Sequence, residues 1–568
     1  MTIADDTIET DVLVIGSGAA GLSAAVTAAA HGARVIVAEK ADVLGGATAW
    51  SGGWMWVPCN PLAVRAGIVE GRAAPRKYLE SVLGNRFDPA RVDAFLDAGP
   101  AMVAFFETQT SLQFDDGNAI QDIYGDLPGA GTGGRSIIAR AIDGRKLGPL
   151  LKLVRAPMRE TALWGMPIQA GADLRAFLTA TRKLDSFMHV ARRVLRHLDD
   201  LVRHGRAMQL ANGSALVARL VASGTKLGVT FMTEAPASEL LVEGGRVVGA
   251  MLRHGGQSVT VRTTRGVVVA TGGFSNDPAR RAALFPHSSD GSQHWSLPPA
   301  SVSGDGARLV EAAGGVIETN VEAAGAWCPV SLVPHADGTV GHFPHIIDRG
   351  KPGVIAVRAD GKRFVNEANG YHDYVRALFA ATMPGEAAES WLIADAKFVA
   401  RYGLGFVKPW PFRVGPWIKR GYLKRAPTLT ELAQSCGIEP AGLGTTVAAF
   451  NTNARLGHDP ELQRGASPYN RYQGDPDVGP NPTLGPIETG PYFAVKVVPG
   501  SFGTFAGIRT DATASALNAK GQPIAGLHVV GSDMASIMGG HYPAGGINLG
   551  PAMTFGYIAG LSLGVPQL

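Results

Sequence analysis

The sequence contains few cysteines, no long apolar run and little net charge. Its three cysteines, Cys59, Cys328 and Cys436, are far apart in a chain of 568 residues and odd in number. Their spacing indicates neither a disulfide framework nor a zinc site, so no metal is expected and a reducing compartment is favoured. No stretch of roughly 18 or more apolar residues is present, so no membrane-spanning helix is expected.

The small net charge argues against nucleic-acid binding as the function. A net charge of +4 is too small at this length to favour nucleic-acid binding. Residues 1–11 are acidic and polar, unlike a signal peptide, which favours a cytoplasmic protein. Basic residues gather in segment 182–206, which is predicted to be a helix with a basic face. That face is either simply solvated or makes peripheral contact with a membrane or a reservoir of apolar substrate.

The chain opens with a pattern that is typical of dinucleotide binding. Residues 11–15 are a short apolar strand, and Gly16, Gly18 and Gly21 then form G-x-G-x-x-G before an alanine-rich helix. A second strand ends at Glu39, which would bond ribose hydroxyls. The glycines allow a tight turn and bring the backbone close to a pyrophosphate at the helix N-terminus.

Further glycine-rich turns favour FAD over NAD. One follows the second strand at 40–58, another follows a buried strand at 263–277, and a third lies at 521–536. In the third turn, Asp533 is placed to bond ribitol or ribose hydroxyls. The predicted cofactor-binding residues are Gly16, Gly18, Ala19, Ala20, Gly21, Glu39, Lys40, Gly46, Ala47, Thr48, Ser51, Gly52, Gly53, Ala235, Ala270, Gly272, Gly273, Asp305, Gly531, Asp533, Gly546, Asn548 and Leu549.

These turns, with 74 glycines and an apolar share of 46%, predict a large α/β enzyme that leaves its nucleotide fold and later rejoins it. We expect a Rossmann-type FAD-binding domain over 1–300, with a helical excursion at about 141–206. Residues 301–495, richer in proline and aromatic residues, would be an inserted α+β substrate (cap) domain. Residues 496–568 would return to the FAD-binding domain.

Motifs along nearly the whole chain resemble the fumarate reductase/succinate dehydrogenase flavoprotein superfamily, and within it the 3-ketosteroid dehydrogenase branch. They are GGATAWSGGWMWVP, DGKRFVNEANGYHDY, RGYLKRAPTLTELAQSCGIEPAGL, SPYNRYQGD and GLHVVGSDMASIMGGHYPAGG. The resemblance implies FAD, two domains and introduction of a C=C bond next to a ketone. The expected substrate is a small apolar cyclic ketone, with a steroid favoured, and the external electron acceptor is left open.

One motif distinguishes the sub-branches. Fumarate reductases resemble this chain around residues 360–374, but place a catalytic arginine where it has Tyr371. A tyrosine cannot neutralise a dicarboxylate, although it can abstract a proton from carbon. The histidine that attaches flavin covalently in the respiratory enzymes is absent from the 45–53 turn, so non-covalent FAD is expected.

The resemblance also implies catalytic roles. Tyr371 would take the α-proton, Tyr542 and the Gly546 amide would hold the ketone oxygen, and the β-hydride would go to the flavin. Since tyrosine has an ordinary pKa near ~10, a second tyrosine is expected to support the base, and Tyr124 matches it best. Tyr374 is a rival for the base.

The loop after Tyr542 departs from the family pattern. Ala544 and Ile547 are bulkier than the usual residues, and Asn548 can donate a hydrogen bond. The favoured function is 3-ketosteroid Δ1-dehydrogenation, while Δ4-(5α) desaturation and desaturation of a non-steroid cyclic ketone stay open. A fumarate-reductase-like enoate reductase and a non-catalytic flavin carrier are the more distant alternatives.

Overall fold

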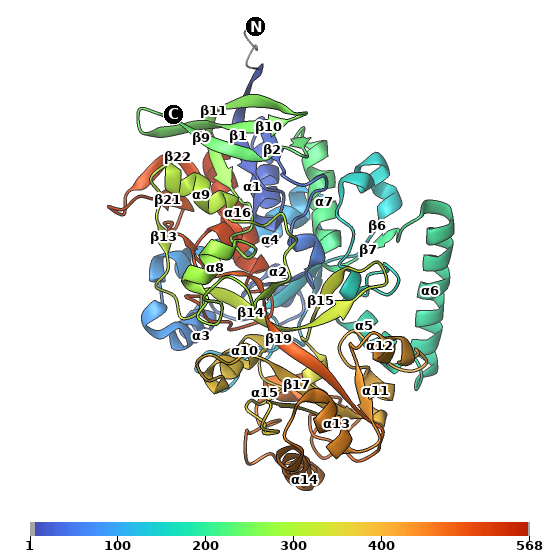
Figure 1. Ribbon diagram of the computed structural model, residues 1–568. Coiled ribbons are helices and arrows are strands. Elements are labelled where there is room, and N and C mark those ends of the chain that lie inside the picture. Colours follow the sequence, from blue (N-terminus) through green and yellow to red (C-terminus); the bar gives the residue numbers. More distant parts are fainter. Residues whose placement is uncertain (1–5, 566–568) are drawn as a thin grey trace.

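The computed structural model describes residues 6–565, which build two sheets flanked by helices (Figure 1). Part of the acidic N-terminal segment, residues 1–5, lies outside the described residues. In the first sheet β1 (Asp6–Ile15) runs parallel to β2 (Val35–Ala38) and to β11 (Gln257–Val269). Its other strands are β8 (Thr230–Met232), β9 (Ala237–Glu243), β10 (Arg246–His254), β21 (Ser515–Leu517) and β22 (Pro523–Val529).

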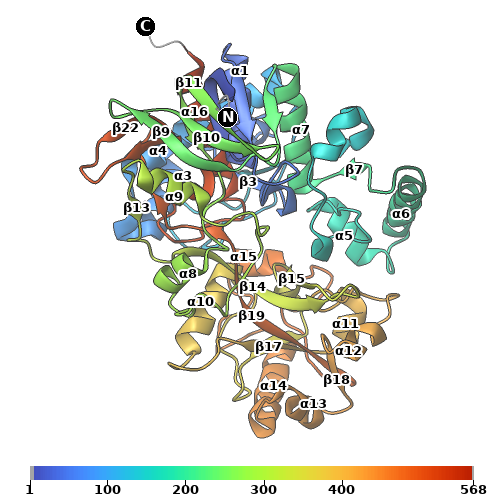
Figure 2. The ribbon, with the colours of Figure 1, turned by 45° about the horizontal axis from the view of Figure 1, so that its top comes forward.

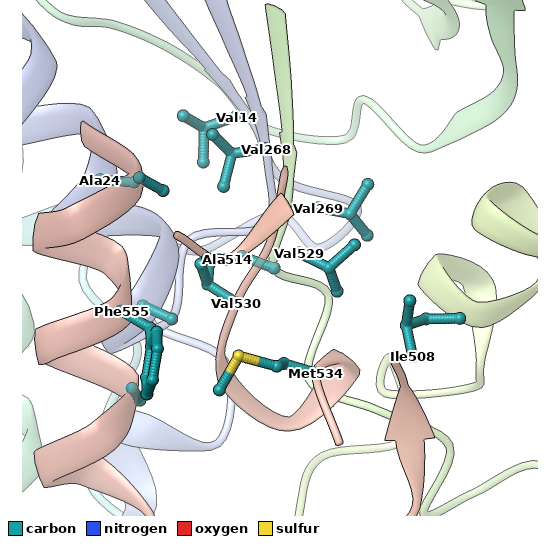
Figure 3. Packing of buried hydrophobic residues seen from close by; sticks show 14 of the residues in the cluster. Val14, Ala24, Val268, Val269, Ile508, Ala514, Val529, Val530, Met534 and Phe555 are labelled. Carbon is teal, nitrogen blue, oxygen red and sulfur yellow. The ribbon is translucent and has the colours of Figure 1, made fainter. Parts of the chain in front are cut away.

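Two helices of small residues pack together against this sheet. They are α1 (Ala19–Ala30) and α16 (Leu549–Gly564), from opposite ends of the chain. A β-carbon on Gly556 would lie 2.4 Å from the Ala20 carbonyl oxygen, so only glycine permits this approach. Figure 3 shows Phe555 of α16 in the same core as Val14 and Val268 of the central strands. The C-terminal segment therefore packs against the N-terminal fold.

The second sheet contains the antiparallel path β15 (Val340–Pro344), β14 (Gly325–Pro334), β19 (Tyr492–Thr504), β17 (Ser390–Asp395) and β16 (Val354–Val357). β12 (Trp295–Ser296) and β18 (Lys424–Ala426) pair with β19. The expected boundaries do not coincide with these elements. β19 crosses the predicted 495/496 boundary, β12 precedes residue 301, and α9 (Asp305–Ala312) packs against β9 of the first sheet.

The remaining elements surround the two sheets. Between β2 and β8 lie η1 (Thr48–Trp50), β3 (Trp54–Trp56), α2 (Pro61–Arg65), α3 (Ala73–Leu83), η2 (Gly84–Arg86), α4 (Pro89–Gln109), β4 (Phe114–Asp116), β5 (Ser136–Ala139) and α7 (Asn212–Lys226). Later elements are α8 (Pro278–Leu284), β13 (Ile317–Glu318), η5 (Asp348–Gly350), α10 (Tyr371–Ala381), α11 (Ala396–Tyr402), α12 (Gly415–Lys419), α13 (Leu429–Cys436), α14 (Pro440–Leu456), α15 (Pro468–Gln473), β20 (Gly507–Ile508) and η6 (Gly531–Asp533).

The segment expected to be a helical excursion contains β6 (Ile142–Asp143), η3 (Gly144–Leu153), η4 (Arg159–Thr161), α5 (Ala172–Thr179) and α6 (Leu184–His204), and it closes at β7 (Gln209–Leu210). In both ribbon views α6 stands at the outer edge of the molecule (Figures 1 and 2). Within residues 6–565, no helix is both long and apolar enough to cross a bilayer.

A buried ion cluster holds the second sheet to the loop before α10. Glu367 accepts hydrogen bonds from Arg363 at 2.7 and 2.8 Å, from Arg464 at 2.9 Å and from the Ala356 amide at 3.0 Å. Arg363 also pairs with Asp459 at 2.9 Å. Burial alone would raise the pKa of Glu367, but the two guanidinium groups outweigh it and lower the pKa to about 2. The R-F-V-N-E motif is therefore a structural anchor that fixes the start of α10.

Replacing Glu367 by glutamine should destabilise the protein by about 3–5 kcal/mol, because two buried guanidinium groups lose their shared counter-charge. The folded pKa lies below the ordinary value of 4.5. This contribution is therefore present above about pH 4.5 and is lost as the pH falls toward 2. Chemical denaturation across this pH range measures both effects. Glu389→Gln, which removes an exposed partner of Lys496, is the matched control and should cost less than about 1 kcal/mol.

Candidate active site

One cavity of about 630 Å³ extends from the first turn of the chain to the wall of the second sheet. At one end it is lined by the loop after β1, including Gly16 and Gly18. At the other end it is lined by Tyr371, at the start of α10, and by Tyr542 from the glycine-rich loop before α16. The fold thus joins the predicted nucleotide site and the predicted catalytic tyrosines in one continuous space.

The nucleotide end is built around a helix N-terminus. Gly16 has φ +108°, and a β-carbon there would lie 2.2 Å from the Ala270 carbonyl oxygen, so the turn requires glycine. The Ala19 amide donates to Thr48 Oγ1 at 2.9 Å. The Ala20 amide has no acceptor within residues 6–565, which leaves it for a ligand at the positive end of α1.

Most predicted cofactor residues line this cavity. Three do not: Gly21, Gly273 and Asp533. A β-carbon on Gly21 would lie 2.1 Å from the Gly16 carbonyl oxygen, so this residue serves close packing inside the turn. Asp533 accepts hydrogen bonds from the Gly272 and Gly273 amides at 3.1 and 3.0 Å. Its carboxylate therefore shapes a turn of the wall, whereas the sequence had suggested contact with cofactor hydroxyls.

The residues present fit FAD. Glu39 is buried at the cavity wall, accepting from Ser17 Oγ at 2.5 Å and from the Ala41 amide at 2.9 Å, and its carboxylate retains capacity for hydroxyl donors. Lys40 lies beside it and pairs with Asp305 at 2.7 Å. Gly46 and Gly52 line the same space with nothing within 4 Å of their missing side chains. A dinucleotide backbone can approach the protein closely here.

At the other end, two phenols lie face to edge. The rings of Tyr371 and Tyr542 have centroids 4.8 Å apart and an interplanar angle of 78°. Asn548 Nδ2 donates to the Tyr542 hydroxyl at 3.1 Å. The Gly546 amide has no acceptor in the described part of the chain. Tyr542 O–H and Gly546 N–H are therefore among the donors that this loop offers to a ligand oxygen.

The electrostatics separate the roles of the two phenols. Burial raises the pKa of Tyr371 well above 10, and the neighbouring Tyr542 and Tyr469 raise it further. Burial also raises the pKa of Tyr542, but a hydrogen bond from Tyr371 opposes that rise. The Tyr542 oxygen accepts from Asn548, so the Tyr542 O–H can donate to a further partner.

Close approach explains the glycine at position 546. This residue has φ +101°, and a β-carbon there would lie 2.7 Å from the Trp56 amide nitrogen. Ala544 and Ile547, expected to alter the substrate pose, are buried in the core and do not line the cavity. Of the three residues in this loop that differ from the family pattern, only Asn548 lines the cavity and donates to Tyr542.

Tyr124 differs from its expected position. Its hydroxyl donates to Asp373 at 2.8 Å, and the residue does not line the cavity. The phenol that the sequence reasoning missed is Tyr469 of α15, which lines the cavity and accepts from Gln473 at 2.7 Å. Its motif, SPYNRYQGD, carries the family resemblance, but it contains two tyrosines, and their orientation is a tertiary property.

The loop before Tyr371 is tied directly to the helix that carries Tyr469. Asn470 donates to Asn369 at 2.9 Å and accepts from Asn366 at 2.8 Å. Tyr374, the rival for the base, points elsewhere: it is fully buried in the core of the second sheet, with its hydroxyl 2.8 Å from Ser390 Oγ. The geometry therefore favours Tyr371 as the reactive phenol.

Replacing Gly18 by alanine tests whether FAD binds next to the turn that follows β1. Gly18 has φ −71°, and its β-carbon would lie 3.5 Å from Thr48 Oγ1, so the protein itself tolerates the methyl group. We expect the melting temperature of the apoprotein to stay nearly unchanged and FAD affinity to fall roughly tenfold or more, equal to about 1.4 kcal/mol. Gly16→Ala should instead destabilise the apoprotein. Unchanged flavin content in purified Gly18→Ala would contradict this placement.

Comparison with known proteins agrees with this geometry. The model of the FAD binding domain family (FAD_binding_2) matches residues 11–549. A 4-oxocyclohex-2-ene-1-carboxylate 5-dehydrogenase from Sinomonas cyclohexanicum is 40% identical over 98% of this chain and 93% of its own. A 3-oxosteroid 1-dehydrogenase from Mycolicibacterium smegmatis is 34% identical over 98% and 97%, respectively.

Among solved structures, a 3-ketosteroid Δ1-dehydrogenase from Sterolibacterium denitrificans in complex with 1,4-androstadiene-3,17-dione is similar, with a TM-score of 0.90 and 32% identity over 98% of this chain and 99% of that one. The resemblance predicted from the motifs and the FAD cofactor are thereby confirmed. The chain belongs to the FAD binding domain family, in the 3-ketosteroid dehydrogenase branch of the fumarate reductase/succinate dehydrogenase flavoproteins, and is an FAD-dependent oxidoreductase that acts on CH–CH groups.

Proposed function

We propose that this enzyme introduces a C=C bond α,β to a ring ketone, with Tyr371 as the base and with Tyr542 and Gly546 as the carbonyl-binding pair. In this proposal the first sheet is the Rossmann-type FAD-binding domain and the second sheet is the inserted cap. The observation that carries the proposal is the Tyr542 hydroxyl, which accepts from Asn548, beside Tyr371 in a cavity continuous with the nucleotide end.

The steps assigned to the protein follow from this arrangement. Tyr542 O–H and Gly546 N–H bind the ketone oxygen, which acidifies the α-carbon and stabilises the developing enolate; losing one such donor typically costs about 3–4 kcal/mol. The Tyr371 phenolate removes the α-proton. FAD, when bound non-covalently, supplies the acceptor for the β-hydride.

One feature of the chain supports Tyr371 as a phenolate. It is the first residue of α10, where the helix dipole favours negative charge. The neighbouring Tyr469 and Tyr542 act in the opposite direction and raise its pKa. Burial opposes ionisation, and for that reason the phenolate, once formed, is a strong base toward a weakly acidic C–H bond.

The relatives supply the candidate substrates: a 3-oxosteroid desaturated at the Δ1 position, as first expected, or a six-membered 4-oxo ring. Desaturation at Δ4 stays an alternative for the steroid. An enoate reductase is disfavoured because no arginine of the described chain lines the cavity to hold a dicarboxylate. A flavin carrier is disfavoured because it needs no base beside a carbonyl-binding pair.

Anaerobic mixing with a panel of 3-ketosteroids and cyclohexanones tests the function. A substrate should bleach the flavin absorbance band of the wild-type enzyme, whereas Tyr371→Phe should retain FAD and lose bleaching by roughly 100-fold or more. Tyr374→Phe is the control and should bleach normally, because its hydroxyl faces Ser390. The proposal fails if no ketone reduces the flavin while an unsaturated acid reoxidises the reduced enzyme.

We further propose that α6 rests on a membrane surface. Its exposed apolar side chains recur at helical spacing and form one face: Leu184, Phe187, Met188, Leu195, Leu198 and Val202. Val202 is 88% exposed and Leu184 75% exposed. Arg192 on the same helix has no ion pair among the described residues, and it favours anionic headgroups. The other side of α6 packs against α5 through Ser186 and His189, and α5 in turn contributes Leu174, Phe177 and Leu178 to the cavity.

Vesicle co-sedimentation measures this contact. The enzyme should bind anionic phospholipid vesicles, and Phe187→Asp or Leu195→Asp should each weaken binding roughly tenfold or more, since each removes an exposed apolar side chain that would be buried on contact with the bilayer. Leu456→Asp, at a residue of α14 that is 74% exposed, is the matched control and should leave binding unchanged. Concentration-dependent dimerisation abolished by the α6 variants, without vesicle binding, would contradict the membrane assignment.

A further inference from the structure

One cation on the cavity wall lacks a counter-charge. Lys408 lies between α11 and α12, in a segment that packs near β15 (Figures 1 and 2). Its Nζ lies 5.2 Å from the ring centroid of Phe406 and 6.0 Å from that of Phe343. Within residues 6–565 it makes no hydrogen bond and no ion pair. Burial without an opposing carboxylate lowers the pKa of Lys408 to about 8, so the side chain is still mainly protonated near neutral pH.

The other two lysines of the wall and Asp348 already have polar partners, although Asp348 Oδ1 has no hydrogen-bond partner among the described residues. Lys40 pairs with Asp305, and Lys351 donates to the carbonyl oxygens of Gln473 and Gly474, both at 2.7 Å. Asp348 accepts from His345 at 2.7 Å and from the Gly405 amide at 3.1 Å, with Arg349 adding positive charge nearby. Among the three lysines that line the cavity, Lys408 alone is left without a polar partner in the described chain.

The backbone that carries Lys408 is fixed in place. Leu404 and Val407 exchange two backbone hydrogen bonds, at 2.9 and 3.1 Å. The Gly405 amide is held by Asp348 and the Phe406 amide by the Tyr422 hydroxyl at 2.8 Å. The Lys408 side chain therefore starts from a turn whose backbone is held in place, and that backbone requires no reorganisation when a ligand arrives.

We propose that Lys408 binds a carboxylate carried by the ketone substrate, at the end away from the carbonyl that Tyr542 and Gly546 hold. This inference rests on the proposed function, and it defines the substrate class as ring ketones that are also carboxylic acids. A single ammonium group flanked by aromatic faces matches one negative charge on an otherwise apolar molecule. A phosphate would call for several converging donors, and the turn offers none besides Lys408.

Matched acid and amide substrates test the inference. One pair is 4-oxocyclohexanecarboxylate and its carboxamide, and the other is a 3-ketosteroid with a side-chain carboxylate and its amide. In one of the two pairs, the wild-type enzyme should prefer the acid to its amide. The pair that shows this preference tells whether the substrate is a short acid or a long one. In Lys408→Gln, the KM for that acid should rise roughly 10- to 100-fold, as for a hydrogen bond to a charged group, while the KM for the amide changes little.

Two further variants show whether the effect of replacing Lys408 comes from the loss of its charge or from a change in the folded structure. Lys408→Met keeps the length and the contact with the aromatic rings, and should lose the preference for the acid without loss of melting temperature. Lys397→Gln removes an exposed charge from α11 that does not face the cavity, and should behave as wild type. If the wild type does not distinguish acid from amide, or if Lys408→Gln and Lys408→Met retain the preference, the inference is overturned.

A binding measurement keeps this inference distinct from the proposed function. 4-Hydroxybenzoate and 4-hydroxybenzamide place a phenol where the ketone would lie and cannot be desaturated. Calorimetry with the FAD-loaded enzyme should show tighter binding of the benzoate, and that difference should disappear in Lys408→Gln. If no ketone reduces the flavin but the benzoate preference depends on Lys408, the proposed function fails and the carboxylate site stands. If neutral ketones bleach the flavin but the benzoate binds no more tightly than the benzamide, the proposed function stands and the carboxylate site fails.

Discussion

The catalytic end of this enzyme depends on one buried carboxylate, Glu367. Two arginines converge on it from different segments of the second sheet unit, and its backbone carbonyl accepts from Arg349. Ions this deeply buried are stable only when all of their hydrogen-bonding positions are filled, so the cluster admits one arrangement of the surrounding segments. That arrangement sets the start of α10, where Tyr371 lies four residues after Glu367.

The cavity is polar where the backbone faces it and apolar where side chains do. At the nucleotide end, glycines and a helix N-terminus expose amides that a pyrophosphate can accept from. At the catalytic end, buried phenols supply hydrogen bonds without fixed charge, which suits a reaction in which negative charge develops only transiently on a ketone oxygen. Lys408 breaks this pattern, because it adds a permanent charge at a wall that is otherwise aromatic.

Local sequence predicted the parts whose function depends on local geometry. Gly16 and Gly18, which were predicted to bind the cofactor, line the cavity, because a strand, a tight turn and a helix follow one another within a few residues. Tyr371 and Tyr542 were brought together as expected, because each lies in a motif that the family resemblance covers. The predicted domain boundaries, in contrast, fell inside β19 and next to α9, because one long strand can serve two units and a shift in composition does not fix where a strand or helix begins.

What the sequence by itself determined is the cofactor class, the return of the C-terminal segment to the first sheet and the pair of phenols beside the nucleotide end. These follow from glycine spacing, from small residues on α1 and α16, and from motifs that are contiguous in the chain. Only the tertiary structure decided that Tyr469 and not Tyr124 lines the cavity, that Asp533 holds a turn, and that Lys408 has no counter-charge among residues 6–565. Each of these depends on which segments, distant in sequence, pack against the same side chain, and neither periodicity nor spacing encodes that.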